Sequence, residues 1–241
     1  MISGIYAHRV YHDKALGIPE NSIEAFKRAV ERGWGAEHDV HLLKDGTLAV
    51  FHDSDTSRCT GIKGIIEDLT CEQMKKLRLQ GTDERIPCFD EVLELFENKL
   101  PLIIELKTYK GNHYELAKAV CERLDRYCGE FCIESFDPRA IADVRKLRPD
   151  IIRGQLSQDF IKRPEGLPGY QRYILTNLLL NFMTKPDFIA YKFEDRENKR
   201  NKKCIKNGIQ EVCWTIRTKK DFDTVINSGA IPIFELFDPE R

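Results

Sequence analysis

The chain has 241 residues, of which 41% are hydrophobic and 32% are charged, and its formal net charge is −1 at pH 7. This length suits one large domain or two small ones. The near-zero charge argues against a nucleic-acid partner and against a membrane-surface partner, because both need a basic excess. The basic run at 198–203 directly follows the acidic stretch 193–198, so we interpret it as a solvated helix face.

No segment of the sequence indicates export or membrane insertion. The chain starts without a basic segment or a long apolar stretch, which predicts no secretory signal. The apolar run 173–182 is shorter than the about 20 residues that a membrane span needs, so we predict a buried helix there. The eight cysteines form no CxxC pair and no zinc-binding spacing. We therefore expect reduced thiols in a cytoplasmic protein with no stable membrane anchor.

Short apolar runs alternate along the chain with segments of helical periodicity. In the first such segment, apolar residues at 23, 26 and 30 share one face, Gly33 ends the pattern, and Asn21 and Glu24 have the spacing of a capping box. The predicted strands, in chain order, are 3–8, 35–42, 48–52, 101–106, 130–135, 151–156, 187–193, 210–216 and 231–236. The predicted helices between them are 21–33, 88–98, 113–127, 138–147, 169–183, 195–207 and 219–228.

Repeated strand–helix units with strands that are apolar on both faces predict a parallel sheet covered by helices. Eight such units plus one extra strand fit a closed (β/α)8 TIM barrel, which typically takes about 250 residues. The segment at about 53–86 is rich in turn-forming and charged residues, so we predict an insertion there, between the second and third units. No linker marks a second domain, and we expect residues 1–241 to form a single barrel domain.

Ionisable residues fall at the carboxyl ends of four predicted strands, where a parallel barrel carries its site. They are His8 and Arg9, then Glu37 and Asp39, then His52, and finally Glu105 and Lys107. Because residues two apart on a strand share a face, Glu37 and Asp39 point the same way, and so do Glu105 and Lys107.

The acids Glu37, Asp39 and Glu105 would repel one another if they faced one shielded barrel mouth. A bound hard cation, Mg²⁺ or Ca²⁺, removes that repulsion, because both ions prefer oxygen ligands. Lys107 beside such a cation suggests an anionic substrate, and a phosphodiester suits a lysine and a divalent ion together. His8 and His52 then suit a proton-transfer pair, one accepting a proton while the other donates one.

An ordered set of motifs resembles the glycerophosphodiester phosphodiesterase family from the first strand almost to the end of the chain. The motifs are "AHR" (7–9), "PENS" (19–22), "GAEHDVHLLKDGTLAVFHD" (35–53), "IELK" (104–107), "ESFDP" (134–138) and "CWTI" (213–216). The resemblance implies a (β/α)8 barrel with a small insertion after the second histidine motif. It also implies hydrolysis of glycerophosphodiesters to glycerol 3-phosphate and an alcohol with a divalent cation.

By the same resemblance, His8 and His52 would be the catalytic histidines and Glu37, Asp39 and Glu105 would hold the metal. One histidine would deprotonate the glycerol 2-hydroxyl, which attacks phosphorus to give a cyclic phosphate, and the other would protonate the leaving alcohol. For each of the other residues that the resemblance assigns to the site, a structural role is the alternative to substrate binding. Arg9 would contact phosphate or brace Glu20, Lys107 would contact phosphate or extend to water, and Trp214 would form a substrate wall or belong to the core.

Three places depart from the family pattern. Val10 follows "HR" where glycine is usual, which gives a different first loop. His38 separates the two acids where an apolar residue is usual, and we expect it to be a hydrogen-bonded histidine facing the helix layer. The tail "FELFDPER" replaces the usual "TDxP", which indicates a shifted or remodelled last loop. We expect His41 to be either exposed or a support behind the site.

Two other functions compete with a glycerophosphodiesterase. One is a lysophospholipase D or sphingomyelinase D-like lipid phosphodiesterase, which would want an apolar rim or a membrane anchor. The other is a non-catalytic barrel that binds phosphodiesters or a protein partner. The retention of both histidines and all three acids argues against the second, since unused buried charges are costly.

Overall fold

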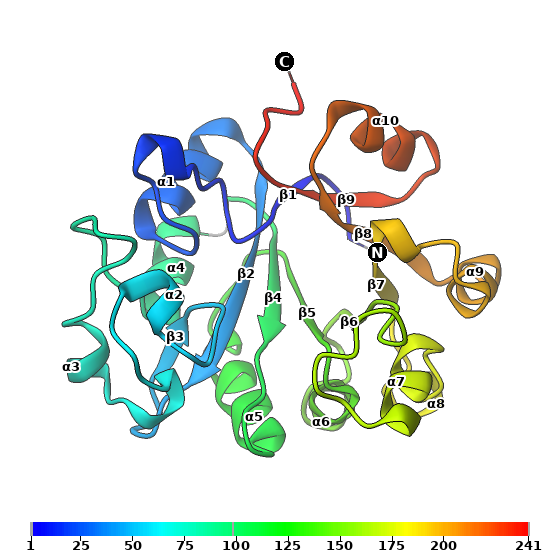
Figure 1. The fold of residues 1–241 in the computed structure, drawn as a ribbon, viewed down its shortest axis with the longest axis horizontal. Coiled ribbons are helices and arrows are strands. Elements are labelled where there is room, and N and C mark those ends of the chain that lie inside the picture. The colour runs from blue at the N-terminus through cyan, green and yellow to red at the C-terminus, as the bar shows by residue number, and fades with distance from the viewer. Residues whose placement is uncertain (1, 98, 241) are drawn as a thin grey trace.

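The computed structural model describes residues 2–97 and 99–240 of the chain. Within these residues nine strands form one sheet in the order β1-β9-β8-β7-β6-β5-β4-β2-β3, and β1 also pairs with β2, which closes the sheet. Every neighbouring pair in the ring is parallel, and β3 pairs antiparallel with the end of β2. The predicted (β/α)8 barrel is confirmed, and helices flank its strands (Figure 1).

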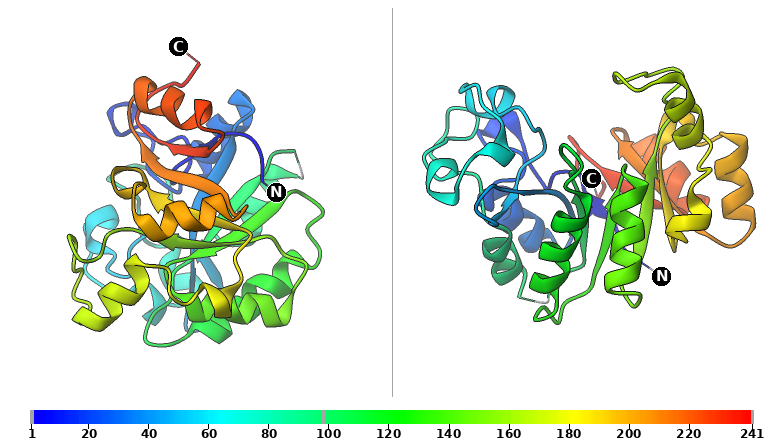
Figure 2. Two further views of the ribbon diagram at one scale, coloured as in Figure 1. Left: turned by 90° about the vertical axis from the view of Figure 1, so that its right-hand side faces the viewer. Right: turned by 90° about the horizontal axis from the view of Figure 1, so that it is seen from below.

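The strands lie close to their predicted positions, and β2 and β8 have the predicted bounds. They are β1 (Tyr6–Ala7), β2 (Gly35–Leu42), β3 (Leu48–Val50), β4 (Leu102–Leu106), β5 (Phe131–Ser135), β6 (Arg153–Ser157), β7 (Phe188–Lys192), β8 (Gln210–Ile216) and β9 (Ile231–Phe234). Figure 2 shows helices outside the strands both on the α1–α5 side and on the α7–α10 side.

The helices also follow the prediction, with one exception. They are α1 (Ile23–Arg32), α2 (Ser57–Thr60), α3 (Cys71–Met74), α4 (Phe89–Phe96), α5 (His113–Leu124), α6 (Pro138–Leu147), α7 (Gly169–Thr176), α8 (Asn181–Thr184), α9 (Lys199–Lys206) and α10 (Lys219–Asn227). Short 3₁₀ turns cover η1 (Lys14–Leu16), η2 (Ile66–Asp68) and η3 (Phe193–Asp195). The predicted helix 88–98 ends on Asn98, which lies outside the described residues.

The prediction of one buried helix over 169–183 is wrong. The segment divides into α7 and α8, and Leu178, one of residues 177–180 between them, has a left-handed φ of 54° that breaks the helix. Tyr173 and Phe182 are 56% and 75% exposed, so the apolar run 173–182 is not buried as a whole. Among the helices of residues 2–97 and 99–240, none combines the length and apolar character that crossing a bilayer would require.

Residues 53–86 leave the barrel between β3 and α4, where an insertion is predicted, and carry α2, η2 and α3. In Figure 1 this segment, drawn in cyan, lies outside the sheet on the left. It has an apolar cluster of its own, in which Cys59, Ile66 and Met74 pack with Phe51 from the end of β3. This packing holds the chain on both sides of His52.

The lower barrel interior is apolar and filled by large side chains. Tyr6 and Phe188 pack there with Ile103, and glycines make the room. A Cβ atom on Gly154 would lie 2.1 Å from the Phe188 ring, and one on Gly35 would lie 2.7 Å from the Tyr6 ring. Because side chains alternate along each strand, the next inward positions above this floor form the barrel mouth.

Candidate active site

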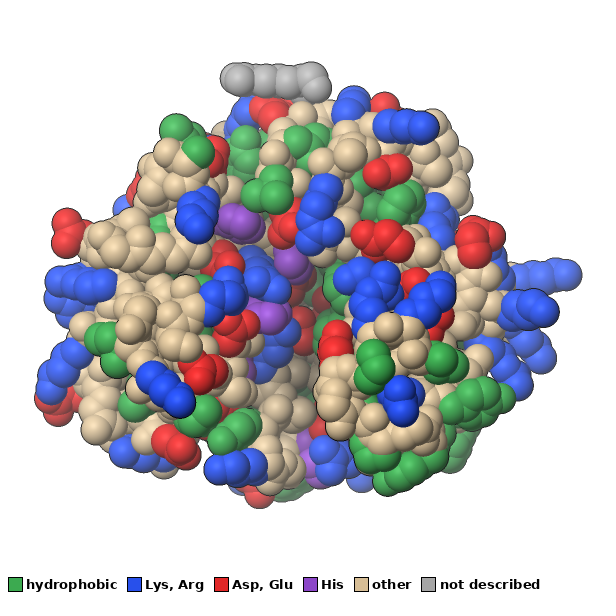
Figure 3. Space-filling view, in the orientation of Figure 1, with side chains coloured by type: hydrophobic (Ala, Val, Ile, Leu, Met, Phe, Trp, Pro, Cys, Tyr) green, Lys and Arg blue, Asp and Glu red, His purple; other side chains and the backbone are tan. Residues whose placement is uncertain are grey.

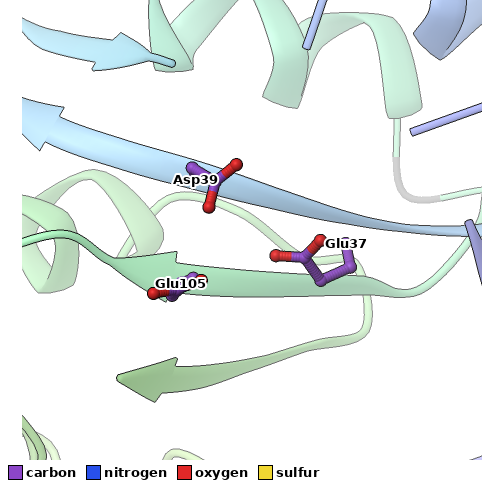
Figure 4. A group of neighbouring side chains, drawn as sticks. All are labelled: Glu37, Asp39 and Glu105. Atoms are coloured by element: carbon purple, nitrogen blue, oxygen red, sulfur yellow. The ribbon is translucent and has the colours of Figure 1, made fainter. Parts of the chain in front are cut away.

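Three carboxylates meet at the mouth of the barrel. Glu37 and Asp39 lie on the inward face of β2, and Glu105 lies on β4 directly opposite Asp39 in the strand register. One oxygen from each group lies within 4.8 Å of the others, and all three side chains are buried. Figure 4 shows the two acids of β2 beside Glu105 near the end of β4. The structure therefore brings together the three acids that the sequence analysis grouped.

The charges of this cluster are only partly balanced by the protein. The Lys107 ammonium lies 3.0 Å from an oxygen of Asp39 and 2.8 Å from an oxygen of Glu105. Burial raises the pKa of Asp39, but Lys107, His52 and Arg9 outweigh it and hold that pKa well below its usual range. Burial and the two neighbouring acids raise the pKa of Glu37 far above its usual value.

Glu105 is also affected: burial, opposed by Lys107 and assisted by Asp39, raises its pKa to about 7. One ammonium among three buried carboxylates thus leaves an excess of negative charge that water cannot screen. A hard divalent cation with oxygen ligands fits this donor set, and Glu37, Asp39 and Glu105 are the residues that could hold it.

Two histidines lie on the wall of the cavity above the acids, and each is held by a carboxylate. His8 follows β1, and its Nδ1 lies 2.6 Å from Oε2 of Glu235 at the end of β9. His52 follows β3, and its Nδ1 bonds to Oδ1 of Asp53. Burial lowers the pKa of His8, and burial together with Lys107 lowers the pKa of His52 to about 4.

The cavity itself has a volume of about 170 Å³, and both histidines line it with Glu37, Glu105 and Lys107. Figure 3 shows a hollow in the middle of this face where histidine, basic and acidic side chains gather. Arg9 and Trp214 also line the cavity. All eight residues that the sequence analysis assigned to a site therefore lie in or directly beside one small cavity.

The contacts of Arg9 and Trp214 agree in part with the structural roles that were the alternatives to substrate binding. The Arg9 guanidinium donates to Oε1 of Glu20 at 3.0 Å, which is the expected brace, and the Arg9 amide donates to Oε2 of Glu37 at 3.0 Å. The indole N–H of Trp214 donates to the carbonyl oxygen of Ala190 at 3.0 Å, and the ring meets Phe136 edge to face. Trp214 is half-buried, so part of its ring is left for the cavity.

Comparison with known proteins agrees with this geometry. Residues 8–235 match the model of the glycerophosphoryl diester phosphodiesterase family. The chain belongs to that family. It is 33% identical to a glycerophosphodiester phosphodiesterase of Caldanaerobacter subterraneus subsp. tengcongensis over 98% of this chain and 94% of the relative. It is also 33% identical to one of Bacillus altitudinis over 67% of this chain and 69% of the relative.

Solved structures of the family share the fold. A phosphodiesterase of Oleispira antarctica in complex with the product sn-glycerol-3-phosphate has a TM-score of 0.81 at 22% identity, covering 97% of this chain and 93% of that chain. A glycerophosphodiester phosphodiesterase of Parabacteroides distasonis has a TM-score of 0.76 at 24% identity, covering 96% of this chain and 92% of that chain. This protein is thus an enzyme of the glycerophosphodiester phosphodiesterase family with the barrel of its structural relatives.

The sequence analysis gave Asn21 the wrong structural role in this family member. Ser22, not Asn21, caps α1, because its side-chain oxygen accepts from the amide of Ala25. Asn21 instead has a left-handed φ of 55°, and its amide group donates to Oδ2 of Asp39 at 2.8 Å. The predicted capping box is therefore wrong, and Asn21 orients an acid of the cluster. Its place in "PENS", beside the cap, concealed this role.

Three further acids of the site were not predicted. Glu235 holds His8, and Asp53 holds His52. Asp53 belongs to the motif "FHD", whereas Glu235 belongs to the tail that departs from the family pattern. Glu134 lines the cavity, opposite Glu105 in the register of β5, and its Oε2 has no hydrogen-bond partner among the described residues. Burial and the neighbouring Glu105 raise the pKa of Glu134 well above its usual value. The sequence signal for Glu134 was its position in "ESFDP", because alternation along the strand points that side chain into the barrel.

His38 and His41 have different surroundings although both lie on β2. His38 faces the helices, between the rings of Phe26 and Phe89, as expected, but neither ring nitrogen has a hydrogen-bond partner among the described residues. The expectation of a hydrogen-bonded His38 is therefore wrong. His41 is buried, and its ring bonds to Glu67 at 2.7 Å and to the carbonyl oxygen of His52 at 3.1 Å. It supports the chain behind His52.

Val10, the residue after "HR", has a backbone conformation that favours glycine. Its φ is 71°, in the left-handed region, which a β-branched residue adopts only under strain. Its side chain is buried in the apolar cluster of the helix layer, and its amide donates to the carbonyl oxygen of Glu37 at 3.1 Å. The packing and this hydrogen bond hold the loop that carries His8 and Arg9.

Proposed function

We propose that this enzyme hydrolyses glycerophosphodiesters to glycerol 3-phosphate and an alcohol, with a divalent cation, Mg²⁺ or Ca²⁺, and with His8 and His52 as the proton-transfer pair. One observation carries the proposal: three buried carboxylates with oxygens within 4.8 Å of one another adjoin a cavity that both histidines line. The sn-glycerol-3-phosphate in the Oleispira antarctica relative supports the choice of product.

The acids and bases of the cavity have separate tasks in this proposal. Glu37, Asp39 and Glu105 would hold the cation, which when bound supplies positive charge for the phosphate oxygens. Lys107 and Arg9 add positive charge on the same side, and Lys107 is held in place by two of the three acids. Trp214 and Phe136 give the cavity an apolar wall against which the substrate can pack.

The two histidines move the protons. One ring accepts the proton of the glycerol 2-hydroxyl while that oxygen attacks phosphorus, and the other gives a proton to the departing alkoxide as the phosphorus–oxygen bond to the alcohol breaks. The carboxylates on Nδ1 fix each ring and leave Nε2 free for the exchange. They also stabilise the positive charge of whichever ring carries a second proton, the donating ring before the step and the accepting ring after it. Water then opens the cyclic phosphate with the two roles reversed.

The decisive experiment removes divalent cations. In excess chelator we expect release of glycerol 3-phosphate from glycerophosphoglycerol to stop, because the acid cluster then repels the phosphate. Adding Mg²⁺ or Ca²⁺ in separate arms should restore it and show which ion serves. Glycerol 3-phosphate added directly to the chelated mixture checks that its detection still works. Full turnover in excess chelator would contradict the proposal.

A lysolipid-directed phosphodiesterase is the second candidate, and one observation favours it. A groove of about 620 Å³ shares Phe136 with the catalytic cavity and is lined largely by apolar side chains, among them Leu167, Tyr170 and Ile174. An acyl chain could lie there while the phosphodiester occupies the cavity. Turnover of lysophosphatidylglycerol below its critical micelle concentration, compared with glycerophosphoglycerol, separates the two candidates.

A further inference from the structure

One basic residue of the catalytic cavity differs from the others in its contacts. Lys192 lies at the end of β7, and its register partner on β8 is Trp214. Both residues line the cavity, and the Lys192 ammonium lies 5.1 Å from the centroid of the Trp214 ring. Lys192 is half-buried, so its charge is shielded from water on one side.

The other basic residues that line this cavity all have carboxylate partners. Arg9 pairs with Glu20 at 3.0 Å, Lys107 pairs with two acids of the cluster, and Arg217 pairs with Glu235 at 2.6 Å. Within residues 2–97 and 99–240, no carboxylate oxygen lies within 4.0 Å of the Lys192 ammonium, the distance that defines an ion pair. Its positive charge is therefore available to a ligand in the cavity.

The position of this ammonium bears on the alcohol part of the substrate. Cationic head groups such as choline bind proteins through the faces of aromatic rings. Here Trp214 is the aromatic ring beside Lys192, and a second cation near it would meet an ammonium that no acid neutralises. The three acids of the cluster lie on β2 and β4, across the barrel from β7 and β8, and Glu134 lies on β5, which pairs with neither β7 nor β8.

We propose that Lys192 is a specificity-determining residue, which makes the enzyme favour glycerophosphodiesters whose alcohol is anionic or neutral and disfavour those whose alcohol is cationic. The inference rests on the proposed function and deepens it. The phosphate of every such substrate carries the same charge, so Lys107, Arg9 and the cation treat all of them alike. Lys192, on the opposite wall, distinguishes them by the charge of the alcohol.

The experiment uses three diesters of glycerol 3-phosphate that differ in charge more than in shape. Their alcohols are choline, its uncharged isostere 3,3-dimethylbutanol, and 3-hydroxypropanoate. For the wild-type enzyme we expect kcat/KM to rise from the cation to the neutral isostere to the anion, by about tenfold at the first step, which is ~1.4 kcal/mol. The Lys192→Met variant should bring all three within about threefold, and Lys192→Arg should keep the wild-type order.

A matched control comes from a second lysine over an aromatic ring. Lys110 lies 4.8 Å from the centroid of the Tyr109 ring, is exposed, and is not among the residues that line the cavity. Lys110→Met removes the same charge from the same kind of stacking and should keep the wild-type order. If Lys110→Met levels the three substrates as well, a general loss of positive charge explains the effect and the proposal is overturned.

Calorimetric titration of the same three diesters separates this inference from the proposed function. Hydrolysis of none of the diesters would contradict the proposed function, whereas the order of their dissociation constants still decides the role of Lys192. A wild-type preference for the choline diester would overturn the inference. An equal loss for all three diesters in Lys192→Met would overturn it too, because Lys192 would then contact the shared phosphate.

Discussion

Both faces of β2 are buried, but polar side chains are accommodated on them in two different ways: as compensated charges on the inner face and as a neutral ring on the outer face. On the inner face, Glu37 and Asp39 are 2% and 1% exposed, and hydrogen bonds from Arg9 and Asn21 and the charge of Lys107 compensate them. On the outer face, His38 is fully buried between two aromatic rings, and burial lowers its pKa to about 4, so it stays neutral. The comparison teaches that burial alone does not distinguish the two faces of β2, whereas the compensating charges on the inner face do.

The histidines on the inner side should show the largest effect. His8→Ala and His52→Ala should each lower kcat for glycerophosphoglycerol about 10²–10⁴-fold, because each would remove a proton-transfer group of the proposed mechanism. The matched variant on the outer face, His38→Phe, should lower kcat less than threefold. A loss below tenfold in either inner variant would remove that histidine from the mechanism.

The next largest effect is expected at Glu37, whose pKa is raised well above its usual value by burial and the neighbouring acids. Glu37→Gln should lower kcat/KM by about 10²-fold, because a lost ligand weakens the charge held at the phosphate by several kcal/mol. In metal-free buffer the same variant should melt about 2–4 °C higher than the wild type, since one repelling acid is gone. The measurements are steady-state kinetics and thermal unfolding with and without cation. A variant that is fully active, or that melts lower without metal, would contradict the role of Glu37.

A smaller effect is expected behind the inner face. Glu67→Gln should lower kcat about tenfold with little change in KM, because the His41 ring joins Glu67 to the carbonyl oxygen of His52 and would so position the ring to which we assign proton transfer. Glu72→Gln is the control, since Glu72 lies in the same insertion but is exposed and pairs only with Lys76. An equal rise in KM and fall in kcat would indicate a general disruption of the insertion.

The outer face should affect stability and its dependence on pH, with almost no effect on catalysis. The folded-state pKa of His38 is lowered from 6.5 to about 4, so the unfolded chain binds a proton between these values while the folded protein does not. The contribution of neutral His38 to the free energy of unfolding is therefore fully present above about pH 6.5 and is lost as the pH falls toward 4. Between about pH 7 and pH 5 the wild type should lose roughly 2 kcal/mol more unfolding free energy than His38→Phe. Urea unfolding at both pH values measures this, and parallel losses would show that His38 titrates normally.

Much of the barrel could be predicted from the sequence because its signals are local. β2, β8 and α6 have the predicted bounds, and a Pro at the first position of α6 with the cap at Asp137 marks its start. The segment 169–183 was predicted wrongly because its apolar periodicity continues through Leu178, where a left-handed residue ends α7. Periodicity reports which residues are apolar, not where the backbone reverses.

The sequence by itself determined the parallel barrel and the site of the insertion. Alternation along the strands grouped Glu37 with Asp39 and Glu105 with Lys107. Position at a strand end singled out His8, Arg9 and His52, whereas Trp214 came only from the resemblance to the family. The tertiary structure decided which charges are compensated. Glu235 reaches His8 from the opposite end of the chain, and Asn21 turns away from its helix to Asp39. Lys192 is left without an acid among the residues that the structure describes. These relations depend on closure of the barrel, which places β1 beside β9 and sets β7 across from β2, and no local pattern encodes them.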